Sequence, residues 1–128
     1  EKHYLAWVWG EPEQDAGEVD LPLCVDWPNR PKQKVDHEEG RHALTLWQKL
    51  KVENGNSLIK LTPITGRSHQ LRVHMLELGH PILGDNLYAN PDALTAAPHL
   101  YLHAASLTIS HPRSGERMTF EAPAPFPV

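Results

Sequence analysis

Four side chains that could bind anions or move protons fall close together in the sequence: Arg67, His69, Arg72 and His74. An arginine guanidinium presents a planar fork of donors that suits carboxylate or phosphate groups. We expect a helix over residues 68–78, which places Arg67 at a loop–helix junction and Arg72 about 140° away round the helix. The two arginines are therefore not expected to share a face, and Arg72 is interpreted as a structural ion pair or a phosphate contact.

The histidines are interpreted as structural or solvated groups rather than as metal ligands. His69 and His74 are also about 140° apart on the expected helix, so each is expected to find its own hydrogen-bond partner. The segment 37–42, H-E-E-G-R-H, has one residue more than the H-E-x-x-H zinc motif, and Gly40 weakens a helix there. Because Cys24 is the lone cysteine, there is no thiolate cluster, and no metal site is predicted.

A second group of chemical interest is the proline-broken loop W-P-N-R-P-K-Q-K, which contains Trp27, Asn29, Arg30, Lys32 and Lys34. Three cations, an aromatic ring and an extended backbone together could follow a phosphate backbone and stack on a base. The alternative is a charged, solvated loop without a partner. A solvated loop is the usual interpretation of such a segment, and the residues alone leave both interpretations open.

The elements that must position these residues are mainly strands. Apolar and alternating patterns predict strands over 3–9, 21–25, 43–52, 57–63, 101–110 and 116–121. Residues 10–20 are expected to form an acidic loop, and residues 112–115 a turn. Asn54-Gly55 is a strong signal for a hairpin between two of the strands.

One long helix is expected among the strands. Its apolar stripe begins at Leu71 and recurs at i + 4 and i + 7, and either Thr65 or Ser68 is a candidate N-cap. An order of strands and hairpins with one principal helix predicts an α+β fold with a mainly antiparallel mixed sheet.

Bulk composition sets weaker limits. The 128 residues suit a single domain, and the net charge of −4 argues weakly against a nucleic-acid partner. Basic residues nevertheless cluster, and a local basic face can bind phosphate on an acidic protein. No apolar run approaches the roughly 18 residues that a membrane span needs, and a lone cysteine favours a reducing, cytoplasmic setting. The first residue is Glu1 rather than Met, as expected of a fragment or a processed product.

The ordered motifs carry a family resemblance. The segment 61–74 reads L-T-P-I-T-G-R-S-H-Q-L-R-V-H, which resembles the G-R-x-H-Q-[IL]-R-x-H signature of RluA-type RNA pseudouridine synthases. Blocks at 79–88, 102–104 and 107–112 agree with that family in order, and the opening block around Tyr4 resembles the one that carries the family tyrosine. The basic loop is closest to the branch that modifies both large-subunit ribosomal RNA and tRNA.

The resemblance implies that residues 1–128 form the C-terminal part of a catalytic domain that isomerises uridine to pseudouridine in structured RNA, such as large-subunit ribosomal RNA or a tRNA stem-loop. The family uses no metal and no cofactor. By the same resemblance, Arg67 pairs with the catalytic aspartate and Tyr4 stacks on the target base. Leu102 corresponds to an apolar residue near that base, although core packing is the more usual role for such a leucine.

One departure from the family is plain. The family nucleophile is the aspartate of an H-R-L-D-x-x-T-S-G-like motif upstream of the tyrosine block, and no such motif occurs in this sequence. Asp85 follows a glycine and is interpreted as a turn former rather than as a substitute nucleophile. These residues alone are therefore expected to be inactive, with a preceding segment or another chain completing the site. The alternatives are a non-catalytic RNA-binding remnant of the same fold and, remotely, an unrelated metal or hydrolase domain.

Overall fold

The computed structural model describes residues 2–110 and 114–128, without the side chains of 107–110 and 118–120. Eight strands and three short helical elements follow one another along the chain. In order these are β1 (Lys2–Val8), β2 (Ala16–Asp20), β3 (Leu23–Val25), the 3-10 helix η1 (Trp27–Asn29), β4 (Gln33–Val35), β5 (Leu44–Glu53), β6 (Asn56–Pro63), α1 (Gln70–Leu78), α2 (Pro91–Thr95), β7 (Leu102–Ser110) and β8 (Arg117–Glu121).

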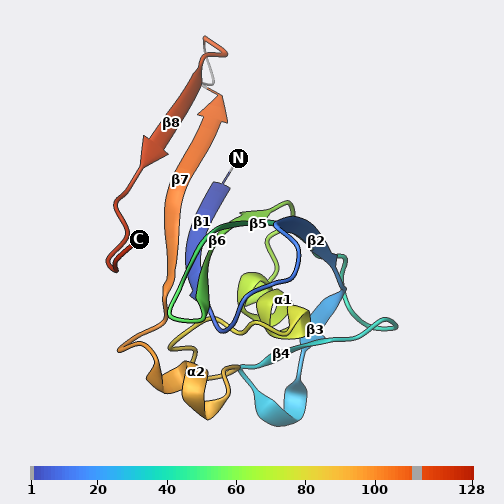
Figure 1. Ribbon diagram of the computed structural model, residues 1–128. Coiled ribbons are helices and arrows are strands. Elements are labelled where there is room, and N and C mark those ends of the chain that lie inside the picture. The colour runs from blue at the N-terminus through green and yellow to red at the C-terminus, as the bar shows by residue number, and fades with distance from the viewer. Residues whose placement is uncertain (1, 111–113) are drawn as a thin grey trace.

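Six of the strands form one sheet in the order β2-β5-β6-β1-β7-β8, and β3 pairs with β4 in a separate ribbon. Each described strand pair is antiparallel. Figure 1 shows α1 lying against the curved part of the sheet, while β7 and β8 extend beyond the remaining strands. The α+β class with one principal helix, predicted from the sequence, is confirmed.

The central strand β1 separates two apolar cores, because alternate side chains of a strand point to opposite faces. Ala6 and Val8 belong to the core that also contains Leu71 and Met75 of α1. On the other face, Trp7 packs in a smaller core with residues of α2 and the C-terminal segment. Tyr4 has the same parity as Ala6 and packs at the edge of the core against α1. Tyr4 therefore lies on the same side of the sheet as α1, the helix that contains the end of the arginine motif.

The predicted hairpin is confirmed between β5 and β6. Asn54 and Gly55 both have positive φ, 54° and 78°, as a type I′ turn requires. Two predictions about boundaries are wrong. The acidic segment 10–20 is not all loop, because Ala16–Asp20 forms the edge strand β2, paired with β5.

The helix begins later than predicted, at Gln70 rather than at residue 68. Its N-cap is His69, which adopts the left-handed backbone conformation and makes no side-chain cap bond, so neither Thr65 nor Ser68 caps it. Its end after Leu78 at a left-handed Gly79 agrees with the prediction. The predicted 112–115 turn and the 107–112 block lie partly outside the described residues.

The ribbon of β3 and β4 lies on the other side of α1, and the basic loop connects its strands. The prediction of a loop over residues 27–34 is wrong at its end, because Gln33 and Lys34 already belong to β4. Leu23 of β3, Val73 of α1 and Tyr88 share a small apolar core, with Val35 of β4 packed against it. This core fixes the ribbon to the helix. None of the helices in the described residues is long and apolar enough to cross a membrane.

Candidate active site

A hollow of about 350 Å³ lies between β1, the segment before α1 and the first turn of that helix. Four side chains that the sequence predicted to bind substrate or take part in catalysis line it: Tyr4, Arg67, Arg72 and Leu102. Tyr4 arrives from β1, and Leu102 from the neighbouring β7, where its Cα is paired with that of Ala6. A larger hollow, of about 540 Å³, also touches Tyr4 but has no arginine in its lining. The smaller hollow is therefore the one in which an aromatic ring meets guanidinium groups.

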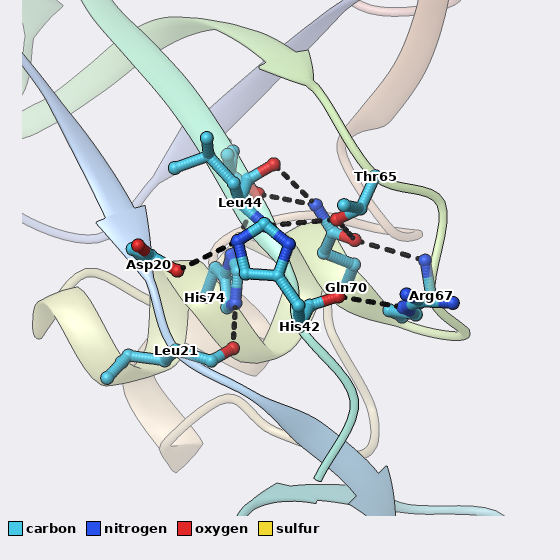
Figure 2. Close-up of polar contacts among 9 residues, drawn as sticks. Asp20, Leu21, His42, Leu44, Thr65, Arg67, Gln70 and His74 are labelled. Carbon is cyan, nitrogen blue, oxygen red and sulfur yellow. Dashed lines mark hydrogen bonds and ion pairs between the residues drawn. The ribbon is translucent and has the colours of Figure 1, made fainter. Parts of the chain in front are cut away.

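The loop that carries Arg67 is held by the side-chain amide of Gln70 (Figure 2). Its Oε1 accepts the backbone N–H of Arg67 at 3.0 Å and the Thr65 hydroxyl at 2.7 Å. Its Nε2 donates to the carbonyl oxygen of Leu44 at 2.9 Å and to the hydroxyl oxygen of Thr45 at 3.0 Å. One buried amide thus joins strand β5, the G-R loop and the start of α1.

The same network continues to His74, which is fully buried. Its Nδ1 is hydrogen-bonded to the Thr45 hydroxyl at 2.8 Å, and its Nε2 to the carbonyl oxygen of Leu21 at 2.9 Å. Burial holds the pKa of His74 below its usual value, despite the opposing hydrogen bond to Leu21. The prediction of a structural histidine is confirmed here.

Arg67 lies at the mouth of the hollow and is only partly covered. Its Nε donates to the carbonyl oxygen of His42 at 2.8 Å. His42 in turn lies 3.3 Å from a carboxylate oxygen of Asp20 across the exposed edge of the sheet. In the described part of the chain, the terminal nitrogens of Arg67 make no hydrogen bond, so they remain available to an anion.

Arg72 is held much more firmly. Its Nε and Nη2 reach the two carboxylate oxygens of Asp85 at 3.0 and 2.6 Å, and Asp85 is completely buried. The hydrogen bonds to Asp85 raise the pKa of Arg72 further above its usual value. Asp85 also accepts the backbone N–H groups of Leu87 and Tyr88, so it does form a turn. The ion-pair interpretation of Arg72 is correct.

The expectation that the two arginines stay apart does not hold for this site. The helical angle applies only within a helix, and Arg67 precedes α1 by three residues. Both arginines consequently line the same hollow.

His69 lines the same hollow and has a defined partner. Its Nδ1 is 2.8 Å from the hydroxyl oxygen of Tyr88, which also accepts the backbone N–H of Gln33 at 2.9 Å. Burial, and then the positive charge of Arg72, lower the pKa of His69, while burial raises the pKa of Tyr88. The first turn of α1 therefore presents an imidazole biased toward its neutral form.

The basic loop lies outside this hollow, at the far end of the β3–β4 ribbon. The Trp27 side chain is 64% exposed, and the Arg30 guanidinium carbon lies 4.8 Å from the centre of its ring. Asn29 donates to the Asp26 carboxylate at 3.0 Å, and Lys34 is 3.9 Å from that of Asp36. The loop thus presents an aromatic surface with a cation stacked on it.

A family model described as RNA pseudouridylate synthase matches residues 1–77. This match covers more than half of the sequence and includes both Tyr4 and the arginine motif. The chain belongs to the RNA pseudouridylate synthase family.

Relatives in the RNA pseudouridylate synthase family support the assignment. The dual-specificity RNA pseudouridine synthase RluA of Escherichia coli is 59% identical over 126 residues, covering 98% of this chain and 58% of that protein. The RluA of Haemophilus influenzae is 55% identical with the same coverage. The chain thus spans less than two thirds of these relatives.

Two solved human structures share the fold. RNA pseudouridylate synthase domain containing 1 has a TM-score of 0.81 and 28% identity, covering 98% of this chain and 55% of the human one. For domain containing 4 the TM-score is 0.75 and the identity 26%, covering 97% and 57% of the two chains. The α+β sheet with its principal helix therefore corresponds to part of the fold of these pseudouridylate synthase domains.

Sequence reasoning did not identify every residue around the hollow. Lys2, two residues before Tyr4 on β1, adds a cation to the lining. Only the register of β1 in the sheet places it there. Asp85 and Tyr88 stood in the recognised 79–88 block, but no sequence signal paired them with Arg72 and His69.

Proposed function

We propose that this chain supplies the arginine and tyrosine side of an active site that isomerises uridine to pseudouridine in structured RNA. The observation that carries the proposal is the hollow in which Tyr4 and two arginines meet, in a chain of the pseudouridylate synthase family. Large-subunit ribosomal RNA and a tRNA stem-loop are the proposed substrates, and the cytoplasm is the proposed setting. The RluA relatives' description as dual-specificity RNA pseudouridine synthases supports this choice.

The reaction breaks the bond between C1′ of the ribose and N1 of uracil, and joins C1′ to C5 of the same base. The C5 proton leaves and N1 gains one, so the overall change is an isomerisation. A base must first leave its stack to be reached. The ring of Tyr4 is placed to stack on the extruded uracil, and Leu102 closes the apolar side of the hollow. An arginine then holds the reacting carboxylate ionised and oriented.

Two arginines qualify for that last role. Arg67 is the candidate that the motif predicts, and its terminal nitrogens are available. The contacts favour Arg72, whose side chain is only 15% exposed and is fixed by Asp85 before any substrate arrives. A guanidinium held in place by a bidentate pair loses little entropy when a second carboxylate binds its remaining N–H groups. Arg67, at the mouth, is better placed to contact an RNA phosphate.

The basic loop is the proposed RNA-contact surface. Trp27 offers a stacking face, Arg30, Lys32 and Lys34 offer charge for phosphates, and Asn29 a side-chain amide. The second candidate function, an RNA-binding remnant without catalysis, would use the same loop. The observation that suits it is the exposed Trp27 ring with Arg30 stacked on it, which could hold RNA without any catalytic group.

Matched variants of the complete enzyme test the assignments. Arg67→Lys and Arg72→Lys keep the charge but lose the planar fork, and single-turnover formation of pseudouridine should fall by about a hundredfold or more for the arginine that holds the carboxylate. The other variant should retain most of the rate of its folded fraction. Normal turnover by both variants would remove the arginines from the chemistry.

The 128-residue chain alone should form no pseudouridine, because it lacks the nucleophile. Turnover by the pure chain would show that the carboxylate assignment is wrong. A complete protein that binds RNA without turnover would support the remnant instead.

A further inference from the structure

Tyr88 contacts the basic loop through Gln33, the N-cap residue His69 of α1, and Arg72 at the same time. It stands in the 79–88 block, after Gly84 and Asp85, where the proposed function gives it no role. A side chain at Gly84 would collide with the carbonyl group of His99, and its φ of 76° suits glycine. The chain therefore turns tightly here and brings Tyr88 under α1.

The hydroxyl group of Tyr88 links two segments that are far apart in the sequence. It accepts the N–H of Gln33, the residue at which the basic loop enters β4, at 2.9 Å. It is also 2.8 Å from Nδ1 of His69, immediately before α1. Because the backbone N–H of Gln33 can only donate, the pairing that uses every group has the Tyr88 hydroxyl donating to Nδ1 of His69.

The ring of Tyr88 is fixed from its other sides. The guanidinium carbon of Arg72 lies 5.3 Å from the ring centre, and the His69 ring meets it edge-on with centroids 5.7 Å apart. The backbone N–H of Tyr88 donates to Asp85, which pairs with Arg72. Tyr88 is nearly buried, in the core that joins Leu23 of β3 to α1. It has little freedom to rotate away.

We propose that Tyr88 is a positioning residue, whose hydroxyl holds the RNA-contact loop at a fixed separation from the hollow that receives the uridine. This inference rests on the proposed function. A nucleic-acid strand that is bound by its backbone at the loop must still deliver one base to the hollow. With the hydroxyl in place, both contacts act on one rigid surface. Without it, β4 and the start of α1 can shift relative to each other.

The test compares the complete enzyme with its Tyr88→Phe variant, which keeps the ring and removes the hydroxyl. At saturating RNA stem-loop, the single-turnover rate should fall about tenfold, as expected for one lost hydrogen bond that aligns the substrate. The Kd for the stem-loop should change less than about twofold, because no phosphate contact is removed. A rate equal to that of the wild type would overturn the proposal, even if the variant melts at a lower temperature.

A second pair of variants tests the same hydrogen bond from its other end. His69→Asn retains an acceptor oxygen near the position of Nδ1 and tolerates the left-handed backbone at φ 54°, so it should keep the rate within about threefold. His69→Ala removes the acceptor and should show the tenfold loss. Equal rates for Asn and Ala would refute the role of the bond, and this pair decides the matter if Tyr88→Phe does not fold. Absence of pseudouridine with the wild-type enzyme would instead overturn the proposed function itself.

Discussion

Replacing Asp85 by alanine is expected to destabilise the protein by about 3–5 kcal/mol, the usual cost of breaking a buried ion pair from one side. Asp85 is completely buried and accepts two hydrogen bonds from Arg72 and two from the backbone of Leu87 and Tyr88. Alanine would leave a guanidinium that is 15% exposed without its counter-ion. It would also leave two backbone donors unpaired in a turn.

Urea unfolding at neutral pH measures this cost, and two further variants calibrate it. Asp85→Asn keeps an oxygen for the backbone donors but loses the charge, so we expect a smaller cost of about 1.5–3 kcal/mol. Asp15→Ala is the matched surface control: Asp15 is 94% exposed and 3.5 Å from Lys49, and removing it should cost less than about 1 kcal/mol. If Asp85→Ala unfolds at the same urea concentration as Asp15→Ala, the reasoning about the buried pair is refuted.

Three further predictions concern acid, salt and the Gln70 network. Folding lowers the pKa values of His69 and His74, so the unfolded chain takes up protons at a higher pH than the folded protein does. The contribution of these histidines to the free energy of unfolding should be complete above the unfolded pKa of about 6.5. It should fall as the pH drops below that value, by at most about 1.4 kcal/mol per pH unit for each histidine. Urea midpoints at successive pH values should show this fall, and a flat profile would contradict it. Alanine at all three cations of the basic loop should lower the slope of log K against log salt for stem-loop binding by up to about three; an unchanged slope would exclude the loop as an RNA contact. Gln70→Leu should cost about 2–4 kcal/mol in unfolding free energy because it leaves buried partners unpaired, and a cost under about 0.5 kcal/mol would show that the network is not structural.

The sequence predicted most of the fold because its patterns were locally strong. Asn54-Gly55 specifies a turn that few other dipeptides favour, and the stripe from Leu71 specifies which face of α1 packs against the sheet. Strand β2 was missed for an equally local reason: within Ala16–Asp20 only Val19 is apolar and buried. An edge strand with one core residue has no alternation to detect.

The residues that line the candidate site could be named from the sequence, but their arrangement in space could not. Tyr4, Arg67 and Leu102 were named from motifs, but they meet only because β1 pairs with both β6 and β7. Arg72 pairs with Asp85, thirteen positions later in the sequence, and the path of the chain between them depends on tertiary packing. Side-chain pairs of this kind are set by three-dimensional contacts that no local periodicity records.

The hydrogen bonds around Gln70 also have a direction. Arg67 N–H can only donate to Oε1, so Nε2 donates to Thr45, and the Thr45 hydroxyl is left to donate its proton to Nδ1 of His74. The remaining proton of the imidazole then lies on Nε2 and points to the carbonyl of Leu21. The hydrogen bonds from Gln70 through Thr45 and His74 to Leu21 therefore form one chain, in which every donor points in the same direction. A proton added at Nδ1 of His74 would face the Thr45 hydroxyl, whose own hydrogen would then lose its acceptor in a fully buried place. His74 can therefore become charged only if this chain of hydrogen bonds breaks. Acid should thus loosen the G-R loop through its buried hydrogen bonds.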